Sequence, residues 1–123
     1  MLVAAASRSS SPAAEVAVGA SARAFVQELF EDLGGITLRA MMGGLAIYSD
    51  GRIFALMTSD ERVWLKAAGA FADRLAAEGS EQFRYARRDG VTARMGYWSL
   101  PDAALDDPEA ACEWARSALA AAG

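Results

Sequence analysis

Histidine is absent from the 123-residue sequence, and cysteine occurs once, as Cys112. Histidine is the side chain that ordinarily titrates near neutral pH and the commonest metal ligand, so Ser-His and Cys-His dyads cannot be built. A single cysteine excludes an intramolecular disulfide and a cysteine-based zinc site within one chain. The sequence therefore offers no catalytic residue, metal site or cofactor site, and we expect a protein that is not an enzyme.

Cys112 allows two interpretations. One is a reactive thiol, but the residue lies in an alanine-rich helical pattern with no cation beside it in sequence to lower its pKa. The other is a small buried apolar residue, which is how free cysteine usually behaves. The pattern favours the structural interpretation, and the lack of disulfides favours a reducing, cytoplasmic location.

The chain also lacks long apolar runs and an excess of positive charge. Hydrophobic residues make up 54% of it, but no stretch reaches the roughly 18 apolar residues that a membrane span needs. The net charge is -4 and the pI is near 4.8. A domain that binds phosphates through counterion release usually has the opposite balance, so binding to nucleic acid is disfavoured and binding to a membrane is not expected.

What is present begins with an Ala- and Ser-rich segment, residues 1–20, with a single proline at Pro12. It has no helical or alternating pattern, so we predict a mobile tail followed by one domain over residues 21–123. A secretory signal is the alternative interpretation. It is disfavoured because no cation precedes the apolar run, which is short and is interrupted by Arg8.

Three segments have the apolar spacing of helices, at residues 21–33, 68–78 and 108–120. The first has Ser21 as a possible N-cap and two glycines as a stop signal. The last is the clearest, because Asp107 can cap the helix and Pro108 suits its first position.

The segments between them alternate like strands, at residues 36–42, 45–48, 53–57 and 62–66, then at 82–86 and 91–98. Asp50-Gly51 is a strong hairpin signal. Short loops between successive strands require antiparallel pairing. We therefore predict an α+β two-layer sandwich, with the helices on one face of the sheet and the other face open.

Gly43-Gly44 could let backbone N–H groups approach a phosphate. The pair lacks the Lys-Ser/Thr that completes a P-loop and the third glycine of a dinucleotide fingerprint, so a tight turn is favoured.

Trp64 and Lys66 share one face of a predicted strand, while Val63 and Leu65 share the other. If the latter two face the helices, Trp64 lies on the open face and marks a partner or self-association surface. Burial of Trp64 under a loop is the alternative.

Arginines gather around the predicted hairpin of residues 82–98, with aromatic residues nearby. Such a mixture can bind nucleic acid by charge and stacking. The alternative is an ordinary solvated strand face, because Glu81 and Asp89 partly neutralise the cations. The arginines are Arg84, Arg87, Arg88 and Arg94.

A set of motifs is spread over residues 25–119. The motifs are Arg39-Ala40-Met41-Met42-Gly43-Gly44, Tyr48-Ser49-Asp50-Gly51-Arg52-Ile53-Phe54-Ala55-Leu56, Val63-Trp64-Leu65-Lys66-Ala67, Phe83-Arg84-Tyr85, Met95-Gly96-Tyr97-Trp98-Ser99-Leu100-Pro101, Asp106-Asp107-Pro108-Glu109 and Trp114-Ala115. In order and spacing they resemble a known family, the N-terminal domain of the TfoX/Sxy competence regulators. Met42 stands where the family usually has phenylalanine, and the chain ends at Gly123 where the full-length regulators continue into a helical C-terminal domain, so the resemblance is to a stand-alone domain.

The resemblance implies an α-β(3)-α-β(2)-α order like that of type III secretion chaperones, and regulators of DNA-uptake genes that have no established catalytic residues. We therefore expect a non-enzymatic regulatory or protein-interaction module, whose partner is another protein or a second copy of the chain. The alternatives are a nucleic-acid-binding domain using the arginine-rich hairpin, and a small-molecule-binding domain.

Overall fold

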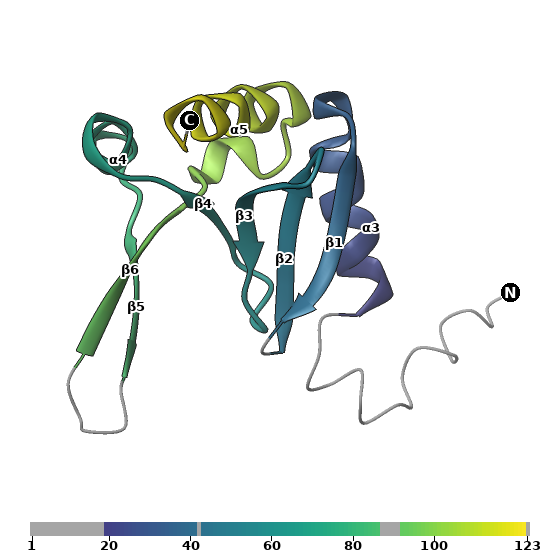
Figure 1. Ribbon diagram of the computed structural model, residues 1–123, viewed down its shortest axis with the longest axis horizontal. Helices are drawn as coiled ribbons and strands as arrows, with labels where there is room; N and C mark the ends of the chain where they lie inside the picture. Colours follow the sequence, from purple (N-terminus) through teal and green to yellow (C-terminus); the bar gives the residue numbers. More distant parts are fainter. Residues whose placement is uncertain (1–18, 42, 87–91, 123) are drawn as a thin grey trace, which may run out of the picture.

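The computed structural model describes residues 19–41, 43–86 and 92–122 (Figure 1). Residues 1–18 of the predicted tail, together with Met42, Arg87 and Arg88, lie outside the described part. The helices are α3 (Ala20–Leu29), α4 (Gly69–Ala77) and α5 (Pro108–Ala122), with 3₁₀ turns η1 (Glu31–Leu33) and η2 (Asp102–Ala104). The strands are β1 (Ile36–Met41), β2 (Gly44–Ser49), β3 (Arg52–Met57), β4 (Val63–Lys66), β5 (Gln82–Ala86) and β6 (Thr92–Ser99).

The strands form one sheet in the order β1-β2-β3-β4-β6-β5, and every neighbouring pair is antiparallel. Figure 1 shows α5 above β3 and β4, α3 beside β1 and β2, and α4 above the β5–β6 hairpin. The predicted α+β fold is confirmed. The resemblance implied three strands before the second helix, and the structure has four because residues 63–66 form a short strand that joins β3 to β6.

The core lies between the sheet and the helices. Alternate residues of the central strands enter it, among them Ile47, Ala55 and Leu65, which are fully buried. Small alanines let α5 approach the sheet closely, so that dispersion contacts are dense. The phenylalanine rings of α3 and β3 meet edge to face, with 5.1 Å between the centroids of Phe30 and Phe54. The alanines of α5 in the core are Ala111, Ala115 and Ala118.

Two turns require their glycines. Asp50 and Gly51 both have positive φ, 49° and 81°, as the predicted hairpin turn demands. At Gly44 a Cβ atom would stand 2.1 Å from the carbonyl oxygen of Met57. Glycine at this position therefore serves the close approach of β2 to β3, and Gly43 before it has the positive φ of a turn, 83°.

The ends of the helices match the predictions unevenly. Asp107 caps α5 as predicted, its Oδ1 accepting a hydrogen bond of 3.2 Å from the backbone N–H of Ala110. The prediction of Ser21 as N-cap is wrong, because Gly19 is the capping residue and the helix already begins at Ala20. The first helix also stops at Leu29, where Phe30 turns fully into the core and a 3₁₀ turn follows.

Cys112 is buried in α5, and its thiol donates a hydrogen bond of 3.5 Å to the carbonyl oxygen of Leu29. Burial raises the pKa of this thiol, which disfavours the reactive thiolate. The residue serves packing, as the structural interpretation holds. Among the described helices, none is long and apolar enough to cross a bilayer.

Candidate interaction face

We call the side of the sheet that the helices do not cover the outer face. Residues directly opposite each other in an antiparallel sheet point to the same side. Because Leu65 and its neighbour Ala55 point to the helices, Trp64 and its neighbour Leu56 point to the outer face. The same pairing continues across five strands and defines the central row of the outer face, which is Arg39, Ala46, Leu56, Trp64 and Ser99.

A second row lies beside the first. It contains Thr37 opposite Tyr48 and, further along the sheet, Lys66 opposite Tyr97. Thr37 and Lys66 are exposed, and both tyrosines are half-buried. The outer face therefore combines aromatic side chains with two exposed cations, Lys66 in this row and Arg39 in the first.

Trp64 lies on the outer face, and of the two alternatives that the sequence left open the structure has burial, because only 6% of the residue is accessible. The ring of Phe83 packs on it edge to face at a centroid distance of 5.0 Å. The guanidinium of Arg62 lies 4.6 Å from the indole centroid and forms a cation–π contact with the ring. Neighbouring side chains, rather than a loop backbone alone, thus cover the indole, which forms the floor of the outer face.

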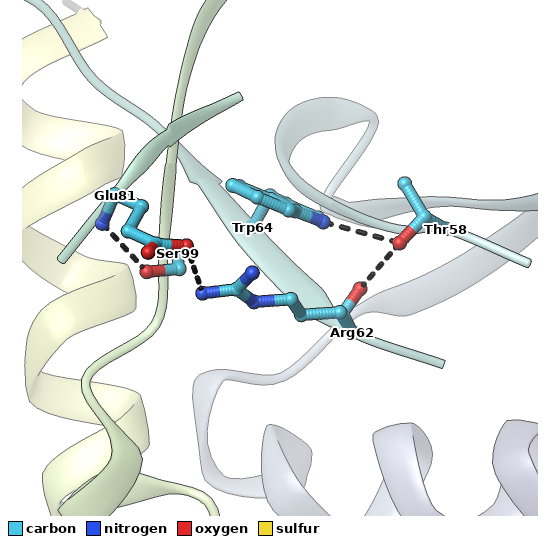
Figure 2. A network of polar contacts seen from close by, with 5 residues as sticks. All are labelled: Thr58, Arg62, Trp64, Glu81 and Ser99. Carbon is cyan, nitrogen blue, oxygen red and sulfur yellow. Dashed lines mark hydrogen bonds and ion pairs between the residues drawn. The ribbon is translucent and has the colours of Figure 1, made fainter. Parts of the chain in front are cut away.

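A polar network fixes this floor (Figure 2). The indole Nε1–H donates to Thr58 Oγ1 at 3.1 Å; the Thr58 hydroxyl donates to Asp60 Oδ1, and its oxygen lies 3.3 Å from the carbonyl oxygen of Arg62. Arg62 pairs with Glu81 at 2.9 Å, and the backbone N–H of Glu81 donates to Ser99 Oγ at 2.9 Å. The network joins the β3–β4 turn to the start of β5 and the end of β6, so it holds Trp64 in one orientation.

The two tyrosines of the second row share one face of the sheet. Burial raises the pKa of Tyr97, and Tyr48 raises it further because two phenolates would repel each other. These residues belong to β6 and β2, which β3 and β4 separate.

The arginine-rich hairpin presents a different surface. Arg84 is exposed, lies opposite Arg94 in register, and lines a depression of about 600 Å³ with Gln82 and Trp98. Trp98 is opposite Leu65 and packs against the helix-covered core. The predicted candidates thus separate, with Trp64 and Lys66 on the outer face and Arg84 beside Trp98. Arg87 and Arg88 lie outside the described residues, and of Arg94 only the backbone is described.

Charge is distributed unevenly between the strands and the helices. Every charged residue within the described strands is a cation, whereas the helices and 3₁₀ turns have more acids than cations. One strand cation, Arg52, is engaged by the helix layer, where its guanidinium donates to the carbonyl oxygen of Leu119 at 2.8 Å. The strand cations are Arg39, Arg52, Lys66, Arg84 and Arg94.

Sequence reasoning missed three contributors to the outer face, namely Arg39, Tyr48 and Phe83. Strand alternation places Tyr48 on the other side of β2 from the buried Leu45 and Ile47, so the sequence did contain a signal for the position of Tyr48. The contact of Phe83 with Trp64 depends on an irregular register between β5 and β6, which alternation cannot supply. No group of acids and cysteine within the described residues could hold a metal ion.

A comparison with curated proteins finds no match for this chain. A comparison with protein families finds one over residues 28–122, and its description is TfoX N-terminal domain. The matched span includes all the described strands, the second and third helices and the whole outer face. The chain therefore belongs to the TfoX N-terminal domain family.

Proposed function

We propose that this chain is a non-enzymatic, competence-related regulatory module that works by binding a protein through its outer face. The observation that carries the proposal is a half-buried aromatic group, Tyr48, Phe83 and Tyr97, arranged around the buried indole of Trp64 on the side of the sheet without helices. Aromatic residues with nearby cations are enriched where proteins bind each other.

The fixed position of the indole supports the same proposal. Trp64 has its ring covered by Arg62 and Phe83 and its N–H bonded to Thr58, so the floor of the face is ordered before a partner arrives. A surface that is already ordered loses less side-chain entropy on association than a mobile one. More of the free energy gained by burying the apolar area of the outer face then contributes to affinity.

Site-specific photocrosslinking in cells tests this proposal. The crosslinking amino acid p-benzoylphenylalanine is placed at Thr37, which is exposed on the outer face, and in a matched variant at Glu113, which is exposed on α5. We expect discrete protein adducts from Thr37 and none from Glu113. Mass spectrometry identifies the adduct, and the purified partner must then bind the purified chain. Equal adduct formation from both positions, or none from Thr37, contradicts the proposal.

A second candidate function is nucleic-acid binding by the β5–β6 hairpin, which exposed Arg84 beside Trp98 favours. It predicts that a labelled single-stranded oligonucleotide binds at low salt, that salt weakens the complex steeply, and that Arg84→Ala weakens it. The net charge of -4 opposes this function. Retention of full oligonucleotide binding in Arg84→Ala, or no binding at low salt, excludes it.

A further inference from the structure

We propose that the outer face recognises an acidic, extended segment of its partner protein, with Arg39 and Lys66 pairing with the carboxylates of that segment. This inference rests on the proposed function and specifies the chemistry of the partner. Carboxylates are the natural complement of these cations, because charge-assisted hydrogen bonds are the strong ones.

The charges on the outer face favour an anionic partner. Within the described part of the chain, Arg39 and Lys66 are exposed and make no ion pair, whereas Arg62 is neutralised by Glu81. Acids lie at the margin of the face, in the β3–β4 turn. There Asp60 accepts hydrogen bonds from Thr58 and from the backbone N–H of Arg62, and Glu61 is exposed beside it. The charged residues of the two rows are thus cations, Arg39 and Lys66, in a chain whose net charge is -4.

Tyr97 adds a neutral donor beside the ammonium group. Lys66 is directly opposite Tyr97 in the register of β4 and β6. A tyrosine hydroxyl group is protonated at neutral pH, since the ordinary pKa of this side chain is about 10. An ammonium and a neighbouring hydroxyl group can bind one carboxylate by charge and by a hydrogen bond together.

The separation of the cations suits an extended segment. Arg39 is on β1 and Lys66 on β4, three strand spacings of roughly 4.8 Å apart, and Lys66 lies two residues further along the strands, so their positions are about 16 Å apart. An extended chain advances about 3.3 Å per residue, so carboxylates about five residues apart can reach both cations. Apolar residues between those carboxylates would lie against the half-buried ring of Tyr48 on β2, because Ala46, Leu56 and Trp64 of the central row are already buried.

Two other occupants fit the face less well. A second copy in a symmetric dimer would bring Arg39 and Lys66 of one outer face against the same residues of the other, and like charges at an interface are unfavourable. A nucleic acid would find two free cations there, which is few for binding that depends on neutralising several phosphates.

Fluorescence anisotropy of the full chain with a fluorescein-labelled, glutamate-rich copolymer of glutamate and tyrosine tests the inference. Poly-L-lysine and a single-stranded oligonucleotide serve as counter-probes. We expect the acidic copolymer to bind most tightly, and Lys66→Glu to weaken it about tenfold because an exposed ion pair is lost and repulsion replaces it. Arg39→Glu should act in the same direction. Arg116→Glu, an exposed charge reversal on α5, is the matched control and should change the affinity less than about twofold.

Tyr97→Phe tests the hydroxyl without removing the ring, so that loss of the fold cannot mimic loss of the site. We expect about fivefold weaker copolymer binding with an unchanged circular dichroism spectrum, since one neutral hydrogen bond is worth about 1 kcal/mol. Equal copolymer affinity in the wild type, Lys66→Glu and Arg39→Glu overturns the inference. So does tighter binding of the oligonucleotide, or a dimer seen by sedimentation that Lys66→Glu abolishes.

The photocrosslinking variant at Thr37 separates this inference from the proposed function. If its adducts form and are lost in Lys66→Glu but kept in Arg116→Glu, both stand. If they persist unchanged in Lys66→Glu and Arg39→Glu, the protein interaction stands and acidic recognition is overturned. If Thr37 gives no adduct, the proposed function fails whatever the copolymer does.

Discussion

The two faces of the sheet bury their side chains by different means. On the helix-covered face, aliphatic residues such as Ile47 and Leu65 are sealed by the alanines of α5 and by α3. On the outer face, strand and turn residues cover one another, with Phe83 and Arg62 over Trp64. The first face has its complement within the chain. The second is ordered but half-covered, which is the condition in which a surface can accept another molecule.

The clearest test of the difference between the two faces is to truncate a side chain on the helix-covered face. Leu65→Ala removes a fully buried side chain from the middle of the core. We expect the free energy of unfolding to fall by about 3 kcal/mol, from lost transfer energy and the cavity left behind. Urea denaturation measures it. Lys66→Ala, next in sequence and exposed on the outer face, is the control and should change the value by less than about 0.5 kcal/mol.

Trp64→Phe probes the buried floor of the outer face and should have a smaller effect. The smaller ring loses the hydrogen bond to Thr58 and part of the contact with Phe83. We expect a loss of about 1.5 kcal/mol of unfolding free energy in the same assay. A loss as large as that of Leu65→Ala would mean that both faces contribute equally to the core.

High pH offers a third, smaller distinction. The pKa of Tyr97 is raised in the folded chain, so between its unfolded value, about 10, and the folded value the unfolded state releases a proton that the folded state keeps. Stability is therefore complete below about pH 10 and falls as the pH rises through this window. Cys112, whose pKa burial also raises, adds a fall that begins at lower pH.

Urea midpoints measured against pH in the wild type, Tyr97→Phe and Cys112→Ala separate these two contributions. Tyr97→Phe should flatten the part of the curve above about pH 10, and Cys112→Ala the part below it. A wild-type curve that rises with pH in this range would contradict the assignment of both groups.

The smallest expected effect belongs to the ion pair at the margin of the outer face. Arg62 and Glu81 are both exposed, so their side-chain interaction should contribute less than about 0.5 kcal/mol. A double-mutant cycle with Arg62→Ala and Glu81→Ala measures this coupling by urea denaturation. A coupling above about 2 kcal/mol would show that the network in Figure 2 acts as a rigid unit.

The sequence predicted those features that depend on local chemistry. The start of α5 follows from Asp107 and Pro108, the hairpin turn from Asp50-Gly51, and the two-layer fold from the spacing of apolar residues. The start of α3 was misjudged because a serine at a plausible position gives no sign that the helix begins earlier, after Gly19.

The outer face was harder to predict because it depends on register across distant strands. Alternation placed Trp64 on the correct side of the sheet. Its burial requires Phe83, which meets it only through the pairing of β5 with β6 and of β6 with β4. The placement of Tyr48 and Tyr97 on one face likewise depends on the register of four strands. No local pattern encodes such contacts.

The place of β4 in the sheet also bears on how the chain folds. Strands β1 to β4 form a meander of neighbours in sequence, whereas the pairing of β4 with β6 joins Trp64 to Ser99 across α4 and a complete hairpin. Closing so long a loop costs entropy before the contacts between β4 and β6 offset it, and contacts between residues far apart in sequence slow folding. We expect this junction to form late, which would make the tryptophan at its centre a reporter of the final kinetic step.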